Sequence, residues 1–350
     1  MGDLPKEGNK EVYYFNVLNV IACFGVIMLH CNGLHGSNHN GSLWIVSNLI
    51  ESIMCIAVPI FFMISGATLV DYRKRYTTKI YLKKRFMKTV IPFFIWSCIA
   101  GVVMVYLNNI RNIPFDYSFR AIVASIINTK YNPVYWFFIP LFSIYLSIPI
   151  VSLIPKKKHI YLYIIFYGFL TVSVLPTVFK LFSAHFNSAI KAPFVGGAII
   201  YVFLGYYLAN FEIIQKHRFT IYFLSIIGFC FLFFGTLIIT PKNHTMSRMF
   251  YGITNFPSVL YSTGVFVFFK YLNYDKFKNV IWPINISTIS KYSFGIYLIH
   301  LFYIKFFKWI LYVSVVGLKW TFGGPILIYL ISLFTVILIK KIPVVKKIIP

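Results

Sequence analysis

The chain has 350 residues, of which 59% are hydrophobic and 12% are charged, and its formal net charge is +25. Soluble domains are nearer half apolar and a quarter charged, so this composition excludes a soluble globular protein and indicates an integral membrane protein. The five cysteines all lie in apolar runs without the spacing of a zinc site or a disulfide framework, so we expect neither a metal site nor disulfides.

Ten apolar runs are long enough to cross a bilayer as helices. They cover roughly residues 13–32, 43–70, 89–108, 134–154, 160–179, 193–210, 219–240, 251–270, 292–314 and 323–340. The sequence therefore predicts an all-α integral membrane protein, a bundle of about ten transmembrane helices. Residues 13–342 form one transmembrane domain, between an N-terminal segment of residues 1–12 and a tail of residues 343–350.

The basic residues indicate how this bundle is oriented. If the N-terminus is cytoplasmic, 23 of the 33 Lys and Arg residues fall in segments on the cytoplasmic side, eight of them in residues 71–88. Cytoplasmic segments carry an excess of Lys and Arg, so we expect both termini in the cytoplasm. The positive charge is then a topology signal and a contact with anionic lipid, and we expect no nucleic-acid partner.

The first apolar run carries a polar stripe. Asn19 lies eleven residues before His30, which is about 20° past three full helical turns, so the two side chains share a face. Asn16 and Cys23 fall on the same face. Polar residues at such depth usually face a bundle interior or a water-filled cavity. The alternative is that His30 is a helix-end residue in contact with headgroup water.

The second run carries another polar stripe, formed by Ser47, Asn48, Glu51 and Cys55. Glu51 lies about 12 Å below the outer end of its helix, close to the depth expected for His30. A carboxylate at that depth can hydrogen-bond the imidazole and orient it. The alternative is a protonated Glu51 bonded to a backbone carbonyl or an asparagine.

Aromatic residues enter the fourth run from outside, at Tyr131, Tyr135 and Trp136. Such side chains can stack on a sugar ring, and Tyr135 and Trp136 are the candidates for binding a sugar. The alternative is the aromatic belt that membrane proteins place at the interface.

The ninth run puts Ser293, Tyr297 and His300 on one helical face, with His300 on the inner half of the helix. Tyr297 and His300 are candidates for contact with a substrate that enters from inside. Alternatively, His300 joins two helices by one hydrogen bond.

Six segments carry a family resemblance, and they are "VLNVIACFGVIMLH", "AVPIFFMISGATL", "KKRFMKTVIPFFIWS", "YWFFIPLFSIYLSIPIV", "YVFLGYYLAN" and "SKYSFGIYLIH". In this order they resemble the membrane-bound acyltransferase-3 family, which O-acetylates cell-surface polysaccharides and other glycans, and they are most similar to its branch that acetylates the enterobacterial common antigen. Each is mostly apolar and weakly specific, but together they span residues 17–300 in the order of the family.

The resemblance implies that His30 matches the catalytic histidine of the family. It also implies a bacterial cytoplasmic membrane, a cytoplasmic acyl-CoA donor, which is a substrate and not a bound cofactor, and a hydroxyl of a surface or lipid-linked glycan as acceptor. Arg85 and Lys88 match a basic pair that would hold the CoA phosphates. The family usually has an Asp and a basic residue where Asn16 and Asn19 stand, so another cation substitutes, the donor differs or activity is low.

These observations predict a membrane O-acetyltransferase in which neutral His30 acts as general base while a glycan hydroxyl attacks the thioester. A cysteine nucleophile fits less well: Cys31 leaves the polar stripe by about 100°, and Cys23 lies about 10 Å deeper than His30. The alternatives from other classes are a non-catalytic transporter or flippase of a lipid-linked glycan, and a family relative that has lost catalysis.

Overall fold

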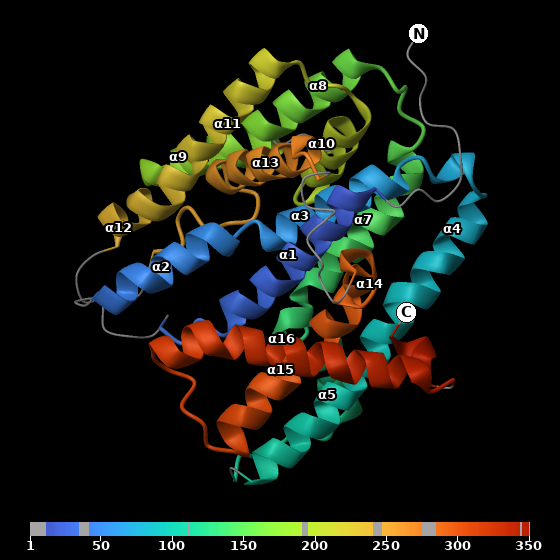
Figure 1. The fold of residues 1–350 in the computed structure, drawn as a ribbon, viewed down its shortest axis with the longest axis vertical. Coiled ribbons are helices and arrows are strands. Elements are labelled where there is room, and N and C mark those ends of the chain that lie inside the picture. Colours follow the sequence, from blue (N-terminus) through green and yellow to red (C-terminus); the bar gives the residue numbers. More distant parts are fainter. Residues whose placement is uncertain are drawn as a thin grey trace.

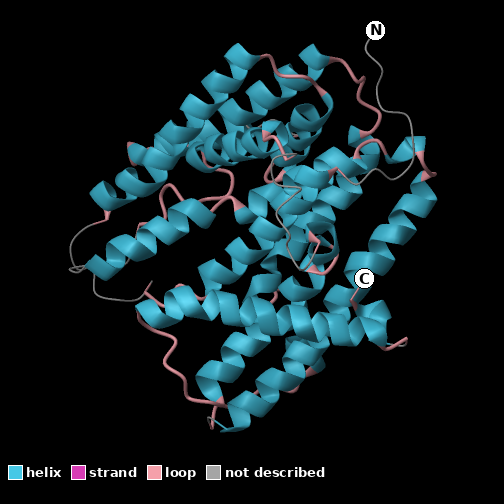
Figure 2. Cartoon of the chain, viewed as in Figure 1, coloured by secondary structure: helices cyan, strands magenta, loops and turns pink. Residues whose placement is uncertain are grey.

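The computed structural model describes residues 12–34, 42–110, 112–190, 195–240, 247–274, 285–343 and 345–349. Every regular element in these ranges is a helix, as Figure 2 shows. Most of the N-terminal segment of residues 1–12 lies outside the described residues. The all-α architecture predicted from the sequence is therefore confirmed for the described part of the chain.

The helices follow the predicted apolar runs closely. The α-helices are α1 (Tyr13–His30), α2 (Ser42–Met54), α3 (Ala57–Leu69), α4 (Thr78–Arg85), α5 (Ile91–Ile110), α6 (Phe119–Ile127), α7 (Phe138–Val151), α8 (Lys158–Gly168), α9 (Leu175–Leu181), α10 (Ile199–Asn210), α11 (Gln215–Cys230), α12 (Thr236–Ile239), α13 (Phe256–Tyr271), α14 (Ile286–Ser290), α15 (Ser293–Trp309) and α16 (Leu318–Lys341). Shorter π and 3-10 turns, among them η2 (Phe86–Val90) and η3 (Pro133–Phe137), join several of these into longer helical stretches.

Seven helical stretches among the described residues are long and apolar enough to cross a membrane. They are Tyr13–His30, Ser42–Lys74, Thr78–Ile110, Pro133–Val151, Lys158–Leu181, Gln215–Ile239 and Leu318–Lys341. The remaining three predicted spans correspond to α10, α13 and α15, which have 12, 16 and 17 residues. Each predicted run thus contains a helix, but three of these helices are shorter than a typical spanning helix.

Helix α1 lies in the middle of the molecule. It packs against α2, α3, α13, α14, α15 and α16. In Figure 1, α3 lies above α1 in this view, and α15 and α16 lie below it. The apolar side chains of α1 that fill these contacts, such as Leu18 and Ile27, are fully buried. A polar residue on α1 is therefore close to several other helices, whichever face it occupies.

Glycines bring α3 and α10 into close contact. A methyl group at Gly66 of α3 would collide with the backbone of Val202, and one at Gly205 of α10 would collide with the backbone of Met63. Small residues at facing positions let two membrane helices approach backbone to backbone. These two glycines therefore fix the position of α3, whose inner half lines the cavity described below.

We expect Gly66→Ala to destabilise the protein, because the added methyl group meets rigid backbone instead of a movable side chain. Overpacking of this kind costs roughly 1–3 kcal/mol. The measurement is the thermal melting midpoint in detergent, followed by size-exclusion chromatography. Gly323→Ala in α16 is the matched control, since nothing lies within 4 Å of the methyl group it adds. Equal melting midpoints for the two variants would contradict the close contact.

Prolines interrupt two of the long helical stretches near the centre of the molecule. Pro59 follows the break between α2 and α3 at Cys55 and Ile56, and Glu51 lies on the α2 side of this break. Pro92 has no N–H to bond the carbonyl of Lys88, and the π turn η2 precedes it. π turns inside α-helices are frequent at functional sites. Here the turn contains Lys88, which lines a cavity.

Candidate active site

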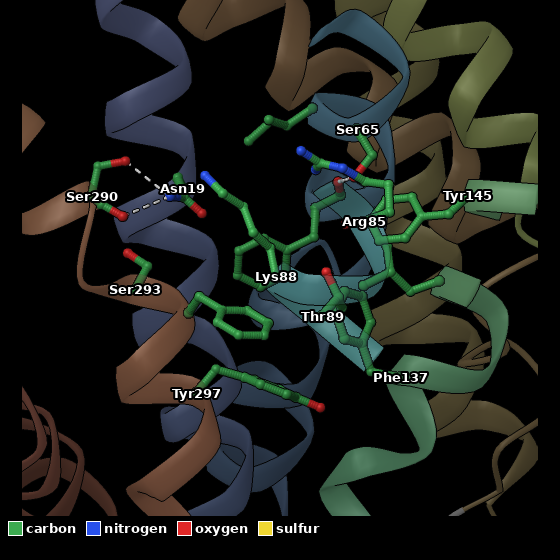
Figure 3. Close-up of a pocket in the computed structure, with 14 residues that line it drawn as sticks. Asn19, Ser65, Arg85, Lys88, Thr89, Phe137, Tyr145, Ser290, Ser293 and Tyr297 are labelled. Atoms are coloured by element: carbon green, nitrogen blue, oxygen red, sulfur yellow. Dashed lines mark hydrogen bonds between the residues drawn. The ribbon is translucent and has the colours of Figure 1, made fainter. Parts of the chain in front are cut away.

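A cavity of about 280 Å³, which we call the inner cavity, lies between α1, α3, α4, η2, α7 and α15. Its described lining residues are Asn19, Phe61, Ile64, Ser65, Arg85, Lys88, Thr89, Phe137, Leu141, Tyr145, Ser290, Ser293, Phe294 and Tyr297. Figure 3 shows these side chains around the cavity. Five segments that are far apart in sequence therefore converge here, which is how a bundle builds a site in its core.

Two cations give the inner cavity its charge. The Arg85 guanidinium lies 5.5 Å from the ring centre of Tyr145, and its Nε atom is buried without a hydrogen-bond partner in the described structure. Lys88 extends toward Asn19 (Figure 3). None of the described lining residues is acidic. The cavity is therefore suited to an anion such as a phosphate group.

The two asparagines of α1 bond to serines of α14. The Asn16 amide donates to Ser287 Oγ at 2.8 Å, and the Asn19 amide donates to Ser290 Oγ at 2.9 Å and to the Ser290 carbonyl at 3.0 Å. Both asparagines also line a second hollow of about 330 Å³, which shares Asn19 and Ser290 with the inner cavity. The inner cavity thus continues toward the N-terminal end of α1.

A third cavity, which we call the outer cavity, lies near the C-terminal end of α1 and measures about 360 Å³. Its described lining residues are Val26, Leu29, His30, Glu51, Val58, Val134, Trp136, Phe137, Arg248 and Tyr297. The imidazole of His30 is exposed in this structure, and the Trp136 side chain is 41% exposed. A base, an acid, a cation and an exposed aromatic ring therefore share one cavity.

Glu51 is held in the outer cavity by an amide. The Asn32 side chain donates to Glu51 Oε1 at 3.1 Å, and it also bonds Ser47 Oγ at 3.0 Å. The guanidinium of Arg248 lines the same cavity and brings a positive charge near the carboxylate. Sequence reasoning missed both residues, because Asn32 is the last residue of the first apolar run and does not share the face of His30, and Arg248 lies between two runs, where an isolated polar residue carries no periodic signal.

Two aromatic side chains separate the inner cavity from the outer cavity. Phe137 and Tyr297 line both of them. The Tyr297 hydroxyl donates to the Val134 carbonyl, and its ring centre lies 5.5 Å from that of Phe137. The two cavities are therefore back to back, with the cationic one on one side of these rings and His30 on the other.

The ring beside His30 is that of His300. The two ring centres are 5.5 Å apart, and His300 is fully buried. The sequence placed His300 on the inner half of its helix and His30 near the outer leaflet, so it predicted two different depths. That prediction was wrong, because α1 ends at His30 while α15 continues for nine residues beyond His300.

The polar face of α1 follows the chain of α14 and α15 in register. The pairs are Asn16 with Ser287, Asn19 with Ser290, Cys23 with Ser293, and His30 with His300. The partners are separated by 270 or 271 residues in every pair. The two segments therefore run side by side in the same direction, and the first and third polar stripes of the sequence form one continuous polar seam.

Tyr135, one of the two predicted sugar-binding residues, does not line the outer cavity. Tyr135 is fully buried, and its hydroxyl donates to the Leu298 carbonyl at 2.8 Å, so no sugar can stack on it. The adjacent Trp136 does reach the outer cavity. The difference arises because η3 is a 3-10 turn, in which successive side chains point about 120° apart. Both candidate cysteines, Cys23 and Cys31, are buried and free.

Comparison with known proteins agrees with this arrangement at the level of the family. The model of the acyltransferase domain, that of the acyltransferase-3 family, matches residues 12–340, which is nearly the whole chain. No curated protein and no solved structure matches the chain. The matched range includes both cavities, the separating rings and the seam between α1 and α15. The chain belongs to the acyltransferase-3 family of membrane acyltransferases.

Proposed function

We propose that this protein moves an acetyl group from acetyl-CoA to a hydroxyl of a lipid-linked or cell-surface glycan, with His30 as general base. The hydroxyl oxygen attacks the thioester carbonyl, a C–O ester bond forms and the C–S bond breaks. His30 takes the hydroxyl proton and passes it to the CoA sulfur. A base in this position contributes typically about 10²–10⁴-fold to the rate.

The observation that carries the proposal is the back-to-back arrangement of the two cavities. Arg85 and Lys88 suit the anionic part of the donor on one side of Phe137 and Tyr297, and His30 lies on the other side. A long donor whose phosphates stay near the cations can extend its thioester along the α1 seam toward His30. The apolar side chains that line the inner cavity, such as Phe61, Leu141 and Phe294, limit the access of water, which would otherwise hydrolyse the thioester.

The remaining side chains take supporting roles in this proposal. In the outer cavity, Trp136 stacks on the acceptor sugar, and Glu51 orients the groups that meet the acceptor. Asn16 and Asn19 line the donor path, while Arg85 and Lys88 supply the positive charge that these two amides lack. The acceptor therefore meets mixed charges and an aromatic ring, whereas the donor meets cations.

The proposed reaction requires that the donor end of the bundle faces the cytoplasm of a bacterial cell. We expect ten spans with both termini inside, because 23 of 33 basic residues then fall on the cytoplasmic side. Reporter fusions after residues 36, 78, 157, 187 and 275 measure this. Signals from outside are expected only at residues 36 and 187, and an external signal at residue 78 or 275 would overturn the orientation.

Membranes that contain the protein, incubated with radiolabelled acetyl-CoA and candidate glycans, test the function directly. We expect label in the glycan fraction, released by mild alkali as an ester is. Membranes that lack the protein serve as the blank. If glycan crosses the membrane without gaining label, the protein is a transporter instead. If purified protein inserts correctly and no glycan gains label, it is a relative that has lost catalysis.

A further inference from the structure

His300 has one satisfied and one unsatisfied ring nitrogen. Its side chain is fully buried in the middle of α15. Nδ1–H donates to the carbonyl of Tyr297, one turn earlier in the same helix, at 2.7 Å. This bond leaves Nε2 as an acceptor, and Nε2 is buried without a partner in the described structure. Buried polar atoms are nearly always hydrogen-bonded, so an unpaired one in the core requires an explanation.

The imidazole of His30 lies next to the ring that carries this nitrogen. The ring centres are 5.5 Å apart, and the planes are inclined by 34°. Two imidazoles joined by an N–H···N hydrogen bond have ring centres roughly 5 Å apart, so a small rotation of the His30 ring brings the pair into range. The His30 side chain borders the outer cavity, which gives it room for this rotation, whereas the buried His300 ring is fixed by its bond to Tyr297.

We propose that His300 is a positioning residue for His30, a role that rests on the proposed function. Its Nε2 accepts the N–H of one His30 nitrogen and so fixes the His30 tautomer. The other His30 nitrogen then carries its lone pair toward the outer cavity, where it takes the proton of the acceptor hydroxyl. When His30 is protonated, it still donates the same bond to His300. The tautomer of a catalytic histidine is commonly fixed in this way by the bond that its other nitrogen makes.

Two substitutions separate this role from simple packing. His300→Asn keeps an amide N–H for the Tyr297 carbonyl but is too short to reach His30. His300→Gln carries an amide oxygen near the position of Nε2, where it can accept a bond from His30. A purely structural role predicts similar losses for the two variants, whereas the positioning role predicts that His300→Gln retains more function. Tyr303→Phe is the matched control. Tyr303 lies on the same helix as His300, and this variant removes a 2.6 Å hydrogen bond from α15 to Thr335 of α16.

The first measurement determines the His30 tautomer by spectroscopy and does not depend on acyl transfer. Nitrogen-15 histidine labelling and two-bond ¹⁵N–¹H spectra of the full chain in micelles report the tautomer of each neutral histidine, and His30→Ala assigns the His30 signals. We expect a single His30 tautomer in the wild type and in His300→Gln, and a mixture in His300→Asn. A mixture in the wild type, or an unchanged single tautomer in His300→Asn, would overturn the proposal.

The second measurement is kinetic, with acetyl-CoA and a glycan that gains label in the membrane experiment described above. We expect His300→Asn to lower kcat roughly 10–100-fold, as loss of an orienting partner does, with the KM for acetyl-CoA changed less than about twofold. His300→Gln should recover most of kcat, and Tyr303→Phe should match the wild type. Equal losses in His300→Asn and His300→Gln contradict the positioning role. Absence of transfer by the wild type would refute the proposed function, and the tautomer result would still stand on its own.

Discussion

His30→Ala is expected to reduce acyl transfer at least about 10²-fold, because in the proposed mechanism the attacking hydroxyl loses the base that takes its proton. The loss should appear in kcat, with the KM for acetyl-CoA nearly unchanged, since His30 lines the outer cavity and not the cationic inner one. Expression and melting midpoint should change little, because the His30 ring is exposed. The measurement is initial-rate transfer of radiolabelled acetyl groups at saturating donor.

Two further variants make the His30 experiment specific. His217→Ala removes an exposed histidine at the start of α11 and should leave the rate unchanged. Glu51→Gln should cost less than His30→Ala, because an amide still accepts a hydrogen bond in the place of the carboxylate. Normal transfer by correctly inserted His30→Ala protein would refute the assignment and make His300 the candidate base.

The double variant Arg85→Ala/Lys88→Ala is expected to raise the KM for acetyl-CoA about 100-fold and to change kcat little. A hydrogen bond to a charged group contributes roughly 1.5–3 kcal/mol, and each 1.4 kcal/mol is tenfold in affinity, so roughly tenfold for each cation is a conservative expectation. The measurement is the dependence of the transfer rate on donor concentration, supported by direct binding of CoA to purified protein.

The control for the cations removes the same amount of charge from the same helical stretch, Thr78–Ile110. Lys79 and Lys83 lie on α4, are exposed and do not line the inner cavity. Lys79→Ala/Lys83→Ala should therefore insert like the first double variant and keep the wild-type KM. If both double variants raise the KM equally, the effect is a general one of surface charge, and the inner cavity does not bind the phosphates selectively.

The π turn η2 explains how Arg85 and Lys88 both come to line the inner cavity. Arg85 and Lys88 are three residues apart, and in a regular helix both would lie on one face. The π turn η2 inserts extra chain between α4 and α5, and Pro92 follows it. Both side chains still line the inner cavity, whereas the preceding lysines of α4 do not. The turn therefore divides the long basic run into a surface part and a cavity part.

Hydropathy and period were sufficient to predict the helical class and the polar faces of the individual helices. The apolar runs had to be helices, because a chain in a bilayer must satisfy its own backbone hydrogen bonds. The spacing of Asn16, Asn19, Cys23 and His30 placed them on one face of α1, and in the structure all four meet the same neighbouring segment. Local geometry is enough for such predictions, since 100° per residue holds along any α-helix.

Tertiary packing decided which polar faces meet. His30 and His300 are 270 residues apart in sequence. Their rings lie side by side because of the relative axial position of α1 and α15, which no local sequence pattern encodes. The close contact of Gly66 and Gly205 positions α3, and the turn η3 sends Tyr135 into the core and Trp136 toward the outer cavity. Arg248 joins Glu51 only through the fold. The sequence alone thus determined which residues share a helical face, whereas contacts between distant helices, fixed by side-chain volume and backbone approach, decided which of those faces form the site.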